Sequence, residues 1–319
     1  GFAANDMPYL SFAPFDSVAK YGFMGVELFF MISGFVILFT AQNSSPSKFT
    51  ISRITRLYPA FWVCMSITAL TIVLIGGERY DVSLSQYLYN LSLISSIFGV
   101  EDIDGVYWTI IVEIKFYLMI FLLLCFKVID KIKFFLLAWL AASVFSQFFT
   151  LPYSITFFLL AESSPYFIAG ACCYLIRKEG LDWFTSILLV GSYLYAIYLL
   201  GAQVTALEKQ YQTEYNLGIL ISSISIFYII FLLLAFDKLQ SINKPFMLSL
   251  GIITYPLYLL HQKIGYMIFN LVGHTLPVWI TLLLVICIIT FSSLIIHYKV
   301  EKVYGPKLKN FLSSLIPAK

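Results

Sequence analysis

Charged residues are scarce in this chain. Asp, Glu, Lys and Arg make up only 12% of its 319 residues, whereas 60% are hydrophobic, and the mean hydropathy is +0.89. A soluble domain of this length could not bury so much apolar surface, because ordinary globular proteins are about 25% charged. The composition therefore excludes a soluble enzyme and predicts helices that cross a lipid bilayer.

Other absences narrow the class further. The five cysteines lie in or beside apolar runs without the spacing of a metal site, so we expect no metal. Residues 1–20 lack the basic and apolar regions of a signal peptide. The chain carries no internal repeat and no low-complexity tract, and we expect no nucleic-acid partner.

The apolar residues are grouped in runs long enough to cross a bilayer. The predicted fold class is all-α, a polytopic bundle of transmembrane helices with nine visible spans. Residues 87–100 are apolar but too short to span, so we expect an interfacial or re-entrant helix there. The nine runs lie near residues 22–41, 56–76, 106–127, 133–150, 154–176, 183–201, 216–236, 248–271 and 277–298.

Basic residues give the orientation, because cytoplasmic loops are rich in Lys and Arg. With nine spans the connections alternate between the two sides of the membrane, and fifteen of the twenty basic residues fall on one side. The C-terminus is therefore expected in the cytoplasm and Gly1 outside. The other side receives Lys20, Arg79 and Lys209, and the spans contain Lys115 and Lys263.

A few ionisable residues lie inside the predicted spans. Glu113 is about 10 Å along its helix at ~1.5 Å per residue, where a charge costs at least ~2.5–3.5 kcal/mol. It is a candidate base, or a carboxylate that orients a histidine, and the alternative is a structural ion pair with Lys263. Glu27 lies near the outer end of its span. It is either a site residue or a side chain that snorkels to water. Glu162 is followed by Ser-Ser-Pro, which lines a cavity or bends the span.

His261 lies in the middle of a predicted span. Thr254, Tyr258 and His261 share one helix face, and Pro256 removes a backbone donor beside it. We interpret His261 as a hydrogen-bonding group or substrate contact, with a satisfied core histidine as the alternative. The Ser-Gly pair at 33–34 allows close helix packing, or backbone approach to a thioester.

Four segments together resemble the acyltransferase-3 family of bacterial integral-membrane acyltransferases. They occur in the family's order, and the resemblance covers about residues 20–304. The segments are Gly25-Val-Glu-Leu-Phe-Phe-Met-Ile-Ser-Gly-Phe-Val-Ile37, Arg53-Ile-Thr-Arg-Leu-Tyr-Pro-Ala-Phe-Trp62, Trp108-Thr-Ile-Ile-Val-Glu-Ile-Lys-Phe-Tyr117 and Thr254-Tyr-Pro-Leu-Tyr-Leu-Leu-His261.

The resemblance implies transfer of an acyl group, usually acetyl, from cytoplasmic acyl-CoA to a hydroxyl of a cell-surface saccharide or its lipid-linked precursor. Acetyl-CoA, or another acyl-CoA, would be the donor substrate, and no cofactor would be permanently bound. The protein would lie in the bacterial inner membrane. Arg53 and Arg56, at i and i+3, would bind the phosphates of the donor; the alternative is anchoring to anionic lipids. The catalytic candidates are Glu113, His261 and Glu27, and the expected site-lining residues are Trp108, Tyr117, Tyr258 and Lys263.

The family pattern has ten spans, the first carrying an Arg and a His about eleven residues apart, and nothing before residue 20 matches it. We therefore expect one further span before Gly1 in the parent protein; the alternative is a nine-span protein whose N-terminus lies outside. Residues 1–304 form the expected membrane domain, and residues 305–319 a short basic cytoplasmic tail, in part an amphipathic helix. A glycolipid transporter or flippase is the alternative function. The Arg-x-x-Arg pair and the Trp-x4-Glu-x3-Tyr segment favour acyl transfer.

Overall fold

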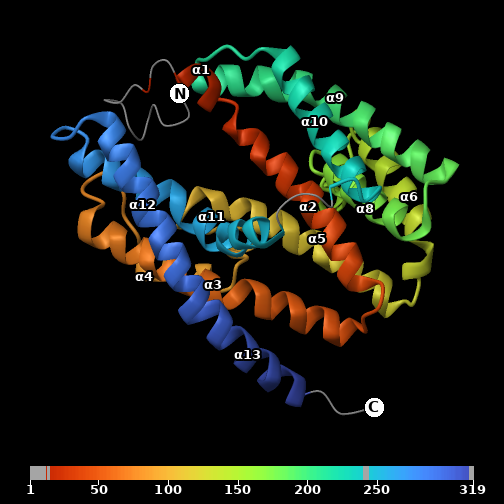
Figure 1. Cartoon of the computed structure of the whole chain (residues 1–319), viewed down its shortest axis with the longest axis horizontal. Helices are drawn as coiled ribbons and strands as arrows, with labels where there is room; N and C mark the ends of the chain where they lie inside the picture. The colour runs from red at the N-terminus through yellow and green to blue at the C-terminus, as the bar shows by residue number, and fades with distance from the viewer. Residues whose placement is uncertain (1–11, 13–14, 240–243, 316–319) are drawn as a thin grey trace. The chain divides into compact units, whose positions relative to one another are not determined.

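The structure is a computed structural model that describes residues 12, 15–239 and 244–315, with the backbone alone at 244–250. All regular structure within these ranges is helical, as predicted (Figure 1). The α-helices are α1 Asp16–Ala19, α2 Gly25–Ala41, α3 Pro46–Ile75, α4 Leu84–Asn90, α5 Trp108–Cys125, α6 Ile132–Phe145, α7 Tyr153–Leu159, α8 Ser164–Glu179, α9 Trp183–Tyr211, α10 Leu217–Ala235, α11 Lys244–Val272, α12 Val278–Ile296 and α13 Lys302–Ser314.

Six helical segments within the described residues are long and apolar enough to cross a membrane. They correspond to the predicted runs that begin near residues 22, 56, 106, 183, 216 and 277. Their outward faces carry large exposed side chains such as Phe39, Val73 and Leu283, which would be unfavourable in water. The chain is therefore a multi-pass membrane protein. The six segments are Asp16–Ala41, Pro46–Ile75, Gly105–Cys125, Trp183–Tyr211, Leu217–Ala235 and Val278–Ser314.

The other three predicted spans behave differently. The run at 154–176 forms α7 and α8, two helices bent by 42° that count together as at most a seventh span. Helix α6 replaces the run at 133–150 and has 14 residues, so it is only about 21 Å long and falls short of a bilayer core of about 30 Å. Helix α11 has 29 residues, but the structure describes only the backbone of its first two turns. Nine spans are therefore not established.

The helices form two compact units. Of the described residues, unit 1 contains 18–49 and 112–239, and unit 2 contains 12, 15–17, 50–111 and 244–315. In unit 1, α8 is the central helix, because every residue from Ser164 to Ile176 is buried. Helices α2, α6, α9 and α10 all contact it. This arrangement gives α2, which carries the Phe-Phe-x-x-Ser-Gly segment, a fixed position in the core.

Unit 2 is built on α3, α11 and α12. Helices α11 and α12 pack against each other. The tail predicted as an amphipathic helix forms α13, which follows α12 through the π-helical turn His297–Glu301 (Figure 1). Residues 87–100 contain the end of α4 and the 3-10 turn Ser95–Phe98, so this segment does not form a span, as expected.

Candidate active site

Glu113 is a buried carboxylate in unit 1 with a polar partner. It lies in the second turn of α5 and is only 7% exposed. The hydroxyl of Ser33 on α2 donates a hydrogen bond to Glu113 Oε1 at 2.5 Å. A hydrogen bond of this kind offsets part of the cost of placing a carboxyl group inside a span. The structure thus joins two of the family-like segments through a hydrogen bond between a serine and a carboxyl group.

Helix α2, which carries Ser33, lies very close to α8. A Cβ atom added to Gly34 would lie 2.2 Å from the carbonyl oxygen of Phe167, and one added to Gly170 would lie 1.9 Å from that of Met31. Both contacts are to backbone, which cannot move aside easily. Close helix packing, one of the two readings of the Ser-Gly pair, therefore accounts for Gly34.

Glu27, on α2 as well, is also buried in unit 1. It is 4% exposed, and the side-chain amide of Gln203 on α9 donates to its Oε1 at 3.3 Å. Its other oxygen, Oε2, has no hydrogen-bond partner among the described residues. The alternative in which Glu27 snorkels to water is therefore wrong, because the carboxylate is buried and contacts α9.

Lys115 and the predicted site residue Tyr117, both in unit 1, contact aromatic rings. The ammonium group of Lys115 lies 3.5 Å from the ring centre of Phe157, a favourable cation–π distance. Tyr117 is 8% exposed and meets Phe49 edge to face. Glu162 is exposed in the turn between α7 and α8, so the Glu-Ser-Ser-Pro cluster marks a bend in the chain.

Tyr258 organises the candidate residues of unit 2. Its hydroxyl lies 2.7 Å from the hydroxyl of Thr109 on α5 and donates to the carbonyl of Val106 at 3.0 Å. The Val106 carbonyl is a shared acceptor, since Thr109 also donates to it. Trp108, beside this cluster in the sequence, begins α5 and is exposed. The bonds join the Trp-Thr segment to the Thr-Tyr-x-Leu-Tyr segment.

His261 is exposed, and its tautomer follows from its hydrogen bond. The Nδ1 atom lies 2.7 Å from the backbone carbonyl of Tyr258. A carbonyl can only accept, so Nδ1 carries the proton, and in the neutral ring Nε2 is left as an acceptor. His261 is therefore not a core histidine, and its Nε2 atom is a hydrogen-bond acceptor in the neutral ring.

Lys263 is held next to a residue that the sequence analysis missed. Asp104 is fully buried, and its carboxylate accepts hydrogen bonds from the backbone N–H groups of Val106 and Lys263. The ammonium group of Lys263 donates to the carbonyl of Ile103 at 2.8 Å. Burial raises the pKa of Asp104, and the two backbone hydrogen bonds oppose that rise. In the sequence, Asp104 resembles an ordinary helix N-cap. Its position directly before Gly105 and the start of a span was the signal that could have drawn attention to it.

The two arginines of the predicted donor site lie near the N-terminal end of α3. Arg56 forms an ion pair with Glu301 at 3.0 Å, and its guanidinium lies 5.3 Å from the ring centre of Tyr255. The other oxygen of Glu301 lies 2.7 Å from Nδ1 of His297. Arg53 is half-buried and donates to Ser52. Glu301, which no sequence motif indicated, thus occupies one arginine.

Three hydrogen bonds link the four family-like segments. Ser33 bonds to Glu113 in unit 1, and Thr109 bonds to Tyr258 in unit 2. Also in unit 2, the hydroxyl of Tyr255 donates to the carbonyl of Leu57 at 3.2 Å. No group of three or more possible metal ligands occurs within the described residues. Each of these three hydrogen bonds lies within a single unit.

Comparison with known proteins gives the family of this chain. A protein of Acidianus two-tailed virus named "Putative acetyltransferase ORF330" is 26% identical over 254 residues, which cover 77% of this chain and 74% of the relative. "Nodulation protein 10" of Rhizobium leguminosarum bv. viciae is 30% identical over 120 residues, 31% of this chain and 32% of the relative. No solved structure matches significantly. The sequence model of the acyltransferase-3 family, described as "Acyltransferase domain", matches residues 6–298, and the chain belongs to this family of membrane acyltransferases.

Proposed function

We propose that this protein is a multi-pass enzyme of the bacterial cytoplasmic membrane, with its C-terminus in the cytoplasm. It transfers an acyl group, in the simplest case acetyl, from cytoplasmic acyl-CoA to a hydroxyl of a cell-surface saccharide or its lipid-linked precursor. The observation that carries the proposal is the set of bonds among the four family-like segments. Family membership favours acyl transfer over glycolipid transport, the alternative function.

The reaction needs a nucleophile, a base and an anchor for the donor. The acceptor hydroxyl oxygen attacks the thioester carbonyl carbon, a carbon–oxygen bond forms, and the carbon–sulfur bond breaks. The proton of the hydroxyl passes through a protein base to the departing CoA sulfur. His261 contacts the acceptor hydroxyl through Nε2. Glu113 is the catalytic carboxylate, and its negative charge stabilises the positive charge of the protonated base.

Arg53 and Arg56 bind the phosphates of the donor. Guanidinium groups bind phosphate oxygens through paired hydrogen bonds. Arg56 is exposed and its pair with Glu301 is partly solvated. The exposed guanidinium of Arg56 can therefore bind a phosphate, while Glu301 keeps its contact with His297.

The test is acetyl-CoA binding to the purified full-length protein by calorimetry, at low and high salt. We expect Arg53→Gln/Arg56→Gln to weaken binding at least ~10-fold at low salt, and less at high salt because ions screen exposed charges. The matched control is Lys48→Gln/Lys131→Gln, which removes two exposed positive charges from the same predicted side. If both double variants bind the donor like the parent, the arginines only anchor the protein to lipid.

A further inference from the structure

Tyr255 of α11 belongs to a family-like segment but has no role in the reaction proposed above. Its hydroxyl donates to the backbone carbonyl of Leu57 on α3 at 3.2 Å. The guanidinium carbon of Arg56, the preceding residue of α3, lies over the same tyrosine ring, 5.3 Å from the ring centre. Both contacts lie within unit 2. Tyr255 is therefore attached to α3 at its hydroxyl and at its ring, directly beside the arginine assigned to the donor.

The ring contact limits how the guanidinium of Arg56 can turn. A cation within about 6 Å of the centre of an aromatic ring is attracted to the face of that ring. The side chain of Arg56 is 46% exposed, and a long exposed arginine otherwise samples many rotamers, whose loss opposes the binding of any ligand. The contact with Tyr255 reduces the number of orientations that remain.

The contacts of Arg56 also determine which of its N–H groups stay available. Nη1 donates to Oε1 of Glu301 at 3.0 Å, and the other Glu301 oxygen lies 2.7 Å from Nδ1 of His297. No hydrogen bond to the described residues engages Nε or Nη2 of Arg56. These two nitrogens form one edge of the planar guanidinium, and two parallel N–H groups match two oxygens of a phosphate. The open edge thus suits bidentate binding of a phosphate.

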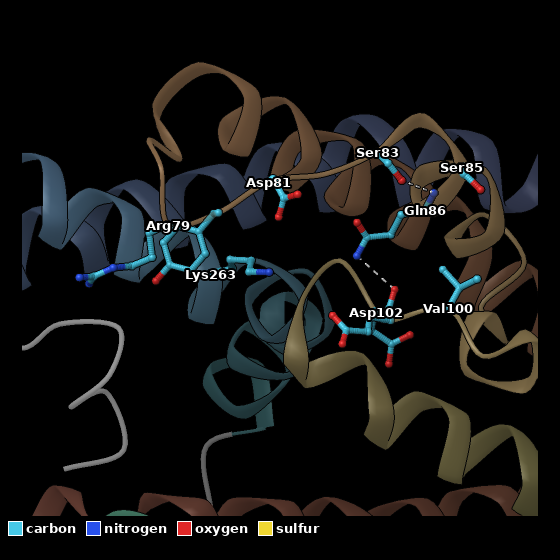
Figure 2. Close-up of a pocket in the computed structure, with 10 residues that line it drawn as sticks. Arg79, Asp81, Ser83, Ser85, Gln86, Val100, Asp102 and Lys263 are labelled. Atoms are coloured by element: carbon cyan, nitrogen blue, oxygen red, sulfur yellow. Dashed lines mark hydrogen bonds between the residues drawn. The ribbon is translucent and has the colours of Figure 1, made fainter.

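The polar cavity of unit 2 is a poorer place for the phosphates of a donor. It has a volume of about 450 Å³, and its wall includes Lys263, eight residues beyond Tyr255 on α11. Figure 2 shows Asp81 and Asp102 in the same wall. Carboxylates repel phosphate groups, and ionised carboxylate and phosphate oxygens both only accept hydrogen bonds. Of these two places, the open edge of Arg56 is the one that suits a donor with several phosphates.

We propose that Tyr255 is a positioning residue of the donor site. Its ring and its hydrogen bond to Leu57 hold the guanidinium of Arg56 so that the edge formed by Nε and Nη2 remains available to a phosphate of the acyl-CoA. Tyr255 acts through Arg56 and takes no part in the chemical step. The inference rests on the proposed function, in which Arg56 binds the donor.

The experiment is calorimetric binding of acetyl-CoA to purified full-length variants that dissect the tyrosine side chain. Tyr255→Leu removes the ring and the hydroxyl, and we expect acetyl-CoA binding to weaken ~3–10-fold, the factor that corresponds to ordering one long side chain on binding. Tyr255→Phe keeps the ring and loses only the bond to Leu57, so acetyl-CoA binding should stay within about 2-fold of the parent. Tyr255→Met gives the same test with another side chain that lacks a ring if Tyr255→Leu does not fold.

Two further variants test whether Tyr255 acts through Arg56. In an Arg56→Gln background the guanidinium is gone, so adding Tyr255→Leu should weaken acetyl-CoA binding no further. Tyr87→Leu is the matched control, because Tyr87 is also half-buried and its hydroxyl lies 2.9 Å from that of Ser66, ten residues beyond Arg56 on α3. This control should bind acetyl-CoA like the parent. Thermal unfolding checks that each variant is folded.

The positioning role is overturned if Tyr255→Leu binds acetyl-CoA like the parent, if Tyr255→Phe binds as weakly as Tyr255→Leu, or if Tyr255→Leu weakens binding equally with and without Arg56. Any of these results leaves the proposed function intact when the parent binds acetyl-CoA and transfers its acetyl group. A parent that shows the expected order of affinities but neither hydrolyses nor transfers acetyl from acetyl-CoA overturns the proposed function and leaves the positioning role. A parent that binds no acetyl-CoA overturns both.

Discussion

The crossing of α2 and α8 allows a stability prediction with a built-in control. In Gly34→Ala the new methyl group would lie 2.2 Å from the carbonyl oxygen of Phe167 and 2.9 Å from its carbonyl carbon. Both neighbours are backbone atoms of a helix whose residues from Ser164 to Ile176 are all buried, so one helix has to shift. Overpacking of this kind typically costs about 1–3 kcal/mol, and we expect Gly34→Ala to lie at or above the upper end.

The control is the same substitution in α9. A methyl group on Gly201 would meet nothing within 4 Å, so Gly201→Ala should gain the usual helix preference of about 0.5–1 kcal/mol for alanine. The assay is thermal unfolding of the purified full-length variants in one detergent. Gly34→Ala should unfold several degrees below the parent, and Gly201→Ala at or slightly above it. Equal unfolding temperatures for the two variants would refute the close approach of α2 and α8.

Two further predictions concern charges outside the spans. The ion pair with Lys133 and the hydrogen bond from Thr185 lower the pKa of Asp182 from 3.8 to about 2, so its stabilisation is present above pH 4 and is lost as the pH falls toward 2. Asp182→Asn keeps the helix cap and should lower the free energy of unfolding by at most about 1 kcal/mol, because the ion pair is partly exposed. Asp182→Ala also removes the cap and should cost about 1 kcal/mol more. Denaturation of both variants across pH 2–7 checks this prediction. Glu301→Gln removes the partner of Arg56 and should tighten acetyl-CoA binding about 2–5-fold at low salt; calorimetry showing weaker binding would contradict the assignment of Arg56 to the donor site.

Some features of the fold and site could be predicted from the sequence because they depend on local composition. The helical class follows from long apolar runs, and the burial of Glu113 follows from its place inside one of them. The run at 133–150 was less informative, because hydrophobicity alone did not show that α6 ends at Phe145. The break within the run at 154–176 had a visible signal in Glu162-Ser-Ser-Pro165.

Partners distant in the sequence could not be predicted. Arg56 and Glu301 are 245 residues apart, and no periodicity shows which helix ends meet. An ion pair between Glu113 and Lys263 was the structural alternative that the sequence offered, and the described hydrogen bonds of these side chains go instead to Ser33 and to Ile103. The sequence left open whether Glu27 is buried or reaches water, because it does not show that Gln203 contacts the carboxylate.

The central claim, that Glu113 belongs to the acyl-transfer machinery, is tested most directly by Glu113→Gln. The amide oxygen can still accept the hydrogen bond from Ser33, so the fold should be kept while the charge is lost. Replacing the triad carboxylate of a serine protease by its amide lowers turnover about 10⁴-fold, and we expect a loss of at least ~100-fold here. The measurement is CoA release from saturating acetyl-CoA with acceptor saccharide, per folded full-length molecule. The account predicts this loss with an unfolding temperature near that of the parent; a variant with near-parental turnover per folded molecule would contradict it.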